Sequence, residues 1–444
     1  MSGAVALMIY FAMLGVLTVG AFLRPPTALA AVNCIFGLKQ WGQSTNAWLA
    51  QHTPVTNIIV GALVLCAIVS ATARHRCFLC HIPKVTWVIC ALLLYSLSSL
   101  AWTPRPDLAA PLWAQSYPYM VTFIVLVPLV VHDTDDLRAA LNWLVVLGGF
   151  LTLLLLIFGH WGTRGLMLGA NSMEEETNPL ALAGLGGSVA VTAMLLRPRR
   201  LSRLMWPLRL LVTGAALLLI VRSGSRGQLL AVVIAILAML PVSLRMTSLN
   251  GMISAATGAL VVAASLGYGY SQYIAGHDVE RWSRSNSAAD TTVRFQMVNK
   301  LLATWQTDGP SVLFGLGNSA SWDPKINGIY PHNVPMEVLG EEGLVGFALY
   351  LVVCGNAIVA LFRAARASMT RGDDRTVVAA LGAGFLFFLF ISFKQGNMLG
   401  SVEFFMYSIL MARLTIPLQQ SARAGLAPAE ARLPPVAPFQ NLMR

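Results

Sequence analysis

The stretch PHNVPMEVLGEEGLVGF, residues 331–347, marks the point where the longest polar interruption of the chain gives way to an apolar segment. His332 and Asn333 stand at its beginning. Three glycines follow at steps of three, namely Gly340, Gly343 and Gly346. After these glycines no charged residue occurs before Arg363, and an apolar run of this length can cross a bilayer. The stretch therefore predicts a titratable imidazole just outside a membrane span, with small residues on the helix behind it.

The composition of the whole chain agrees with a membrane protein. Of its 444 residues, 56% are hydrophobic and 11% are charged, and the mean hydropathy is +0.67. A soluble domain carries about 25% charged residues. The net charge of +11 fits arginine-rich cytoplasmic loops, and no basic face with interleaved aromatic residues points to nucleic acid. The cysteines lie mostly in or beside apolar segments, so no disulfide framework is expected.

Twelve apolar runs of about 17–22 residues are each long enough to cross the hydrocarbon core of a bilayer. They fall near residues 4–23, 54–72, 85–102, 112–131, 138–158, 178–196, 207–221, 228–246, 252–270, 343–362, 377–394 and 399–416. No small-residue cleavage site follows the first run, so we expect a retained span and not a signal peptide. A further run, 26–38, is shorter and is expected to be re-entrant or interfacial; as a span it would make thirteen crossings.

Short basic loops predict the orientation, because lysine and arginine gather on the cytoplasmic side. The loops in question are 74–84, 197–209 and 363–375, and an even number of expected spans separates them. With twelve spans both termini are cytoplasmic and the long loop 271–342 is external, which in a bacterium means periplasmic. We expect residues 1–417 to form one transmembrane domain that includes this loop. Residues 418–444, rich in Ala, Pro, Arg and Gln, are expected to be a disordered cytoplasmic tail.

The external loop 271–342 is too long to be a connector without structure of its own. Asp290 can cap a helix from Thr291 to about Thr304. Met297, Leu301 and Trp305 form one row on that helix. Arg294 falls in the adjacent row with Val298 and Leu302, so we expect it to turn toward the apolar side.

The end of the same loop carries strong turn and cap signals. Asp308-Gly309-Pro310 should break the first helix, and Gly315-Leu316-Gly317-Asn318 is predicted to be a turn. Asn333 can cap the helix that enters the membrane, since Pro335 is tolerated in a first turn.

His332 is the candidate general base. An imidazole has an ordinary pKa of about 6.5, which suits removal of a proton from a hydroxyl at neutral pH. The alternative is a solvated or structurally satisfied histidine. His277 is the other histidine of the loop, and no HExxH or similar ligand spacing occurs, so no metal site is expected.

Several external arginines could hold phosphate. Arg226 lies in VRSGSRG, residues 221–227, at the mouth of a span, where a guanidinium can bind phosphate oxygens through two hydrogen bonds. Arg294 lies in the same loop as His332. Arg222 and Arg164 are further candidates, although an interfacial arginine can also simply reach toward lipid headgroups.

Three other features have less specific interpretations. Glu174–Glu176 could hold a divalent cation, but a run of like charges is more often a solvated loop. Cys77-Phe78-Leu79-Cys80-His81 fits a haem-attachment pattern, yet its loop is predicted to be cytoplasmic, which favours chance. Four aromatic residues could stack on sugars or belong to an interfacial belt, namely Trp282, Trp305, Trp322 and Tyr330.

Two of these motifs resemble those of a known family. His332-Asn333, nine residues and Gly343-x-x-Gly346 resemble the histidine signature of O-antigen ligases of lipopolysaccharide synthesis. Ser225-Arg226-Gly227 resembles an element shared with O-antigen polymerases and bacterial O-oligosaccharyltransferases. Three further features also fit, namely Arg294, Trp305 and the turn at Gly315 and Gly317. The resemblance covers roughly residues 178–400.

The resemblance implies an all-α polytopic membrane glycosyltransferase with a GT-C-like fold. Such ligases transfer O-antigen polysaccharide from undecaprenyl pyrophosphate to a sugar of lipid A–core at the periplasmic face of the inner membrane. They work without a metal or other cofactor and invert the anomeric centre. We expect His332 as the base, with Arg226 and Arg294 on the pyrophosphate. The expected substrate-binding residues are Arg222, Ser225, Asn333, Gly343, Gly346, Trp305 and Arg164.

Three other functions stay open at this point. An O-antigen or exopolysaccharide polymerase uses the same lipid-linked donor with a second lipid-linked glycan as acceptor. A protein O-oligosaccharyltransferase uses a protein acceptor. A membrane transporter would carry inverted repeats and charges near the bilayer midplane, whereas the candidate charges here lie at one face.

Overall fold

The computed structural model describes residues 2–74, 82–161, 166–167, 179–197, 205–245, 284–369 and 372–426, and the single positions 250, 253 and 257. Within these residues the regular structure is helical. Extended pairing in the described part of the chain is limited to an isolated bridge between Trp161 and Leu166. The predicted all-α fold is therefore confirmed.

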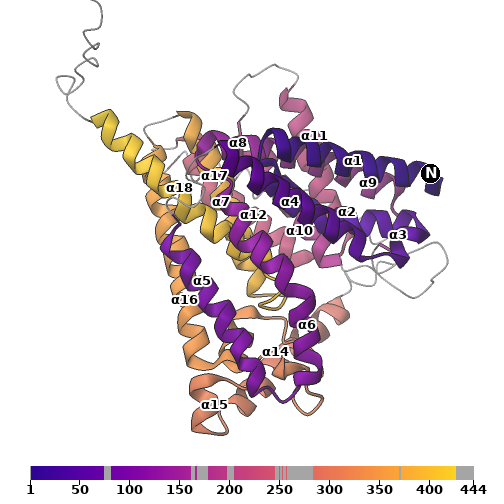
Figure 1. Cartoon of the computed structure of the whole chain (residues 1–444), viewed down its shortest axis with the longest axis vertical. Coiled ribbons are helices and arrows are strands. Elements are labelled where there is room, and N and C mark those ends of the chain that lie inside the picture. The colour runs from indigo at the N-terminus through magenta and orange to yellow at the C-terminus, as the bar shows by residue number, and fades with distance from the viewer. Residues whose placement is uncertain are drawn as a thin grey trace, which may run out of the picture.

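The helices follow one another through the whole chain (Figure 1). The N-terminal part contains α1 (Gly3–Leu23), α2 (Thr27–Thr45), α3 (Ala47–Gln51), α4 (Pro54–Arg74), α5 (Lys84–Ser98) and α6 (Pro106–Tyr119). The middle contains α7 (Val127–Leu129), α8 (Thr134–Trp143), α9 (Gly149–Phe158), α10 (Pro179–Leu195), α11 (Met205–Arg222) and α12 (Arg226–Leu244). The C-terminal part contains α14 (Arg284–Trp305), α15 (Gly309–Phe314), α16 (Val334–Ser368), α17 (Gly372–Ser392) and α18 (Val402–Leu426). Short η segments join some of these: η1 (Ser99–Ala101), η2 (Met120–Leu126), η3 (Leu144–Gly148) and η5 (Ala320–Trp322).

Long helices with apolar outer surfaces make up most of the molecule. Eight helices among the described residues are long and apolar enough to cross a membrane. Their outward side chains are also apolar, as Met8 (72% exposed), Val69 (67%) and Phe362 (71%) show. Water would disfavour so much exposed apolar surface, whereas lipid does not. The chain is a polytopic membrane protein. All expected spans coincide with helices except 252–270, of which only positions 253 and 257 are described.

Helix α2 corrects the prediction of a short re-entrant or interfacial segment at 26–38. It is a continuous helix from Thr27 to Thr45, which at 1.5 Å per residue is about 28 Å long. It runs antiparallel to both α1 and α4: Asn46 at its end donates to the Gly3 carbonyl (2.9 Å), and Arg74 of α4 donates to the Leu23 carbonyl (2.6 Å). The segment thus has the length and packing of a span.

This extra crossing also corrects the predicted side of the N-terminus. The α1–α2 turn at Arg24 shares a pocket with Arg74 and Val130, and Arg413 of α18 donates to the neighbouring Val131 carbonyl (2.6 Å). The C-terminal part of α18 therefore lies at the same end as Arg24, which we call the basic end. Gly3 lies at the opposite end, so the two termini are on opposite sides and not on the same side.

The opposite end, which we call the loop end, carries the external segments. Figure 1 shows α14 and α15 at the end of the molecule where α5 ends and α16 begins. Arg222 there donates to the Leu156 carbonyl (3.2 Å), and His160 lies 3.0 Å from the Ser44 carbonyl. The turns after α2, α9 and α11 thus all lie at the loop end.

Two predicted boundaries differ from the structure. Helix α14 begins at Arg284, so Asp290 lies within it and is not its N-cap; the preceding Ala288 and Ala289 favour helix and extend it backward. Helix α18 continues to Leu426, and Leu418 is buried, because the apolar face of the helix extends beyond the bilayer-length run. The predicted tail is therefore helical at its beginning, and residues 427–444 lie outside the described part.

Candidate functional site

The candidate site is organised around the turn that follows α17, at Phe393 and Lys394. Asn333 donates from its amide nitrogen to the Phe393 carbonyl (2.9 Å). Arg294 of α14 donates to the Lys394 carbonyl (2.9 Å). The elements that carry His332 and Arg294 are therefore fastened to two consecutive residues of a third element.

The segment that carries the third predicted residue, Arg226, packs on the same turn from α12 through its neighbour Gly227. A methyl group placed on Gly227, the next residue, would overlap Cδ and Nζ of Lys394, so the lysine side chain lies directly on the first turn of α12. Arg226 is the first residue of that helix, and Ser225 is its buried N-cap. Glycine is needed here because any side chain would displace the lysine.

His332 is held in an unusual backbone conformation immediately before α16. Its φ of 57° lies in the left-handed region, which costs a non-glycine residue energy and persists only when the surroundings fix it. Asn333 supplies part of that constraint. As predicted, it caps α16: its side-chain oxygen accepts from the Met336 amide (3.1 Å), with Pro335 in the first turn. Both ends of the Asn333 amide are thus engaged within the protein.

Tyr330 packs against the imidazole. The ring centroids of Tyr330 and His332 are 4.3 Å apart, with the planes tilted by 59°. Burial raises the pKa of the Tyr330 phenol, nearby Glu337 raises it further, and Arg294 opposes both. The phenol is therefore neutral at physiological pH and can donate a hydrogen bond next to the candidate base.

The rows predicted on α14 are confirmed by the side-chain burial. Leu301 is fully buried and packs on Gly340 of α16, where a methyl group on the glycine would lie 2.7 Å from Leu301 Cγ. Trp305 is buried as well. This packing turns the adjacent row, with Arg294, toward α17.

Trp305, Gly343 and Gly346 were predicted to bind substrate, but the structure gives them packing roles. The Trp305 indole donates to the Val312 carbonyl (3.2 Å) under α15. Gly343 kinks α16 with a φ of 65°, and a methyl group there would overlap the Gly315 amide. Gly346 lies against Tyr95 of α5 and against the Glu342 side chain. These residues therefore have packing contacts within the protein, and their predicted role in substrate binding stays a prediction.

Arg222 lies apart from the turn at Phe393 and Lys394. Its guanidinium lies over the Trp161 ring, 4.8 Å from the ring centroid, and donates to the Leu156 carbonyl. Arg222 therefore faces α9, whereas Arg226 begins a helix that packs on α17. Arg164, also predicted to bind substrate, lies outside the described residues.

Buried carboxylates in α16 hold the Gly315–Trp322 turn, and the sequence pattern did not predict them. The Glu341 carboxylate accepts from the backbone amides of Ser319 (2.7 Å) and Ser321 (3.0 Å), and from the Ser321 hydroxyl. Glu342 accepts from the Ser96 hydroxyl of α5 and from the Asn318 amide (3.5 Å). These bonds compensate the cost of burying two acids.

The same turn is packed closely enough to require its glycines. Gly315 and Gly317 have φ values of 83° and 94°, which glycine adopts readily, and this confirms the predicted turn. A methyl group on Gly315 would overlap the Glu341 carbonyl oxygen. The Gly317 amide donates to that same carbonyl (2.8 Å). The Gly315–Trp322 turn is therefore fixed onto α16 at Glu341, which follows His332 in the chain.

Glu337 links the helix to the turn between α17 and α18. It is buried, one helical turn before Glu341, and its carboxylate accepts a hydrogen bond from the Met398 backbone. Glu337 of α16 thus contacts the turn between α17 and α18 at Met398, and Arg294 of α14 contacts the same turn at the Lys394 carbonyl.

Among the described residues no group of three or more His, Cys, Asp or Glu side chains could hold a metal ion. Glu174–Glu176, His277 and the Cys77–His81 motif lie outside the described part of the chain, so their predictions stay untested.

Two signals in the sequence could have found the missed residues. Lys394 is the single charged residue between Arg375 and Glu403, and Glu341-Glu342 interrupts an apolar run. Charges in such places are costly and are kept for a structural or functional reason.

Comparison with known proteins places these residues in a family domain. No curated protein matches the chain. A family model described as O-antigen ligase matches residues 211–351. The match includes Arg226, Arg294 and His332, and it supports a glycosyltransferase-like function of the ligase or polymerase type. Residues 211–351 of this all-helical polytopic membrane protein are therefore similar to the O-antigen ligase family.

Proposed function

We propose that this protein transfers O-antigen polysaccharide from undecaprenyl pyrophosphate to a sugar of lipid A–core. The observation that carries the proposal is the meeting of three segments at Phe393–Lys394: the His332 turn, Arg294 on α14, and the first turn of α12 with Arg226. A base and several cations brought to one place suit attack by a hydroxyl and departure of a pyrophosphate.

The reaction proposed for this site has three coupled events. The acceptor hydroxyl attacks the anomeric carbon on the face opposite the pyrophosphate, and His332 accepts its proton. The bond between the anomeric carbon and the phosphate oxygen breaks, and the pyrophosphate takes the bonding electrons. A single displacement of this kind inverts the anomeric centre.

Fixed cations stabilise the leaving group in this proposal. Arg226 and Arg294 bind the pyrophosphate oxygens, and Lys394 joins them because its side chain lies on the first turn of α12. Guanidinium groups held by the protein bind phosphate through two hydrogen bonds and need no reorganisation during the reaction. These residues take the place of a divalent cation, and we propose that neither a metal nor another cofactor takes part.

The orientation follows from the charge of the two ends. Arg24, Arg74, Arg138 and Arg413 lie at the basic end, which the positive-inside preference assigns to the cytoplasm. The loop end then faces the periplasm of a bacterial inner membrane, where both lipid-borne substrates present their sugars. Residues 1–417 act as one GT-C-like transferase in this account.

The direct test uses purified protein, a defined undecaprenyl-pyrophosphate glycan and rough lipopolysaccharide. We expect polymer-bearing lipopolysaccharide to form equally with and without a chelator. A strict requirement for Mg²⁺ or Mn²⁺ would contradict the role given to the arginines. It would make Glu174–Glu176 the candidate ligands of a divalent cation. Transfer without an ion gradient would exclude transport as the sole activity, and a protein acceptor in place of lipid A–core would indicate an oligosaccharyltransferase.

A polymerase is the second candidate, because the Ser225-Arg226-Gly227 turn and the family match both fit it. A deletion strain separates the two. Loss of a ligase leaves bare core and long undecaprenyl-linked polymer, whereas loss of a polymerase leaves core that bears a single repeat.

A further inference from the structure

A pocket of about 220 Å³ opens at the basic end, on the side of the molecule away from His332. Pro26 and Val130 are buried and form its floor. Arg24 and Arg74 lie on its rim together with Asp135 and Asp136 of α8. The rim therefore carries two cations and two anions around an apolar base.

The arginine side of the pocket is fixed by the packing of α4 on α1. Arg74, the last residue of α4, donates to the carbonyls of Leu23 (2.6 Å) and Phe22 (3.1 Å) at the end of α1. These bonds use two of its five N–H donors and hold the guanidinium at the rim. Arg24 follows directly, and its backbone N–H caps α1 while its side chain is exposed.

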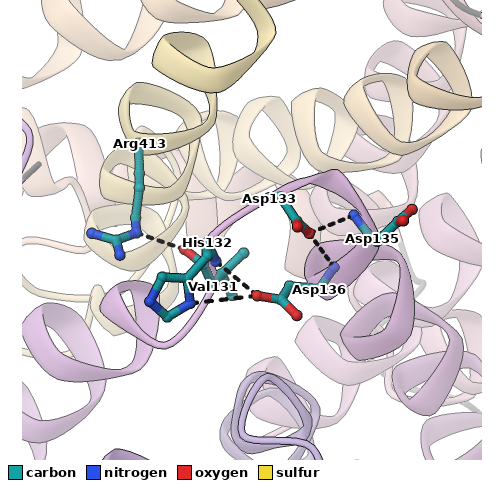
Figure 2. A network of polar contacts seen from close by, with 6 residues as sticks. All are labelled: Val131, His132, Asp133, Asp135, Asp136 and Arg413. Atoms are coloured by element: carbon teal, nitrogen blue, oxygen red, sulfur yellow. Dashed lines mark hydrogen bonds and ion pairs between the residues drawn. The ribbon is translucent and has the colours of Figure 1, made fainter. Parts of the chain in front are cut away.

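The acidic side is equally well held (Figure 2). Asp133 caps α8, because its carboxylate accepts from the amides of Asp135 (2.9 Å) and Asp136 (2.8 Å). The Asp136 carboxylate accepts from the His132 amide (3.0 Å) and lies 3.5 Å from its ring Nδ1. Arg413 of α18 then fixes the preceding residue, Val131. The first turn of α8 is thus preorganised before any ligand arrives.

The charges on the rim favour a ligand that carries a negative group and a positive group. Guanidinium groups suit a phosphate ester, and the carboxylates suit an ammonium group. The pocket is smaller than the roughly 300–1,000 Å³ of most small-molecule sites, so it suits a compact group and not a glycan. It also lies at the ends of membrane spans, where phospholipid headgroups are found.

We propose that this pocket binds the phosphoethanolamine headgroup of a membrane phospholipid. The phosphate lies between Arg24 and Arg74, and the ammonium group contacts Asp135 and Asp136. The bound lipid contacts both the α1–α2 turn and the start of α8, and α2 and α8 already pack on each other. The proposal is independent of the reaction at the loop end.

The test is native mass spectrometry of the purified protein titrated with phosphatidylethanolamine. The variants are Arg24→Ala, Asp135→Asn and the double variant; both side chains are exposed, so the fold should tolerate them. Arg363→Ala is the matched control, because it removes an exposed arginine that does not line the pocket. We expect each single variant to bind about tenfold more weakly, the double variant to lose more, and the control to match the parent.

Two further ligands decide what is recognised. Phosphatidylglycerol, which has the phosphate without the ammonium group, should bind clearly more weakly than phosphatidylethanolamine. Equal binding of the two lipids, or unchanged binding by the double variant, would overturn the proposal. Soluble phosphoethanolamine that binds while the lipid does not would assign the pocket to a soluble compound and overturn the lipid assignment.

Discussion

Arg294 donates a hydrogen bond of 2.9 Å to the carbonyl of Lys394, although 100 residues separate the two. The same lysine lies with its side chain on Gly227, one residue after Arg226. One short turn after α17 therefore contacts Arg294 of α14 and the first turn of α12, which begins with Arg226. Because Arg294 uses the carbonyl and not the side chain of Lys394, the lysine can be changed without removing this contact.

Lys394→Ala should reduce transfer while leaving the fold intact. The variant removes a cation from the first turn of α12 but keeps the carbonyl that holds Arg294. We expect kcat/KM for the lipid-linked donor to fall on the order of tenfold to hundredfold. Steady-state assays with purified protein provide the measurement. Arg105→Ala is the control, because Arg105 is a half-exposed arginine near the same end that pairs with Asp107 (2.8 Å). Equal activity of the two variants would argue against a role for Lys394.

Gly227→Ala tests the same lysine from the other side. The added methyl group would overlap Cδ and Nζ of Lys394 and push the flexible end of that side chain away. We expect lower activity with little change in the midpoint of thermal unfolding. Gly214→Ala on α11 is the matched control, because a methyl group there has no neighbour within 4 Å. Full activity of Gly227→Ala would show that the lysine position is unimportant.

Gly343→Ala should act on stability and not on substrate affinity. Its φ of 65° and the close approach of the Gly315 amide leave no room for a side chain. Strain of this kind costs about 1–3 kcal/mol, so the unfolding midpoint in detergent should fall. Gly355→Ala in the same helix should leave the unfolding midpoint unchanged, because open space surrounds Gly355. A raised donor KM at unchanged stability would instead support the substrate-binding role first predicted for Gly343.

Glu341→Ala should loosen the turn at Gly315–Trp322. The buried carboxylate accepts from two backbone amides, which would lose their partner. An unsatisfied buried amide costs about 1–3 kcal/mol, so we expect a clear loss of stability. Glu341→Gln keeps an acceptor oxygen and should lose less. Hydrogen exchange at Ser319 and Ser321 would locate the effect, and unchanged exchange there would contradict the anchoring role.

Much of this architecture could be predicted because helices that face lipid appear in the sequence as long apolar runs. The packing row on α14 and the Asn333 cap were also visible, since both depend on local spacing. Helix α2 was missed for a physical reason. It packs against other helices and not against lipid, and therefore contains buried polar residues, namely Asn33, Gln40, Gln43 and Ser44. Asn33, for example, accepts from the Tyr407 hydroxyl (3.2 Å). Such residues lower the hydropathy that identifies a span.

The site was predicted in part. The elements of His332, Arg294 and Arg226 come together, but the residue that joins them, Lys394, is far away in sequence and carries no motif. The glycines of the histidine motif have close packing contacts that the sequence did not reveal. Gly343 permits a backbone contact with a turn 28 residues earlier, at Gly315, and spacing alone does not reveal such a partner.

The most direct test of the central claim is the transfer rate of His332→Ala with defined lipid-linked donor and lipid A–core. His52→Ala is the matched control, because His52 is an exposed histidine that stacks on Trp48 at the loop end. Loss of the general base should lower kcat by about 10²–10⁴-fold, with folding and donor binding retained and the control at parental activity. Parental activity of His332→Ala would contradict the account.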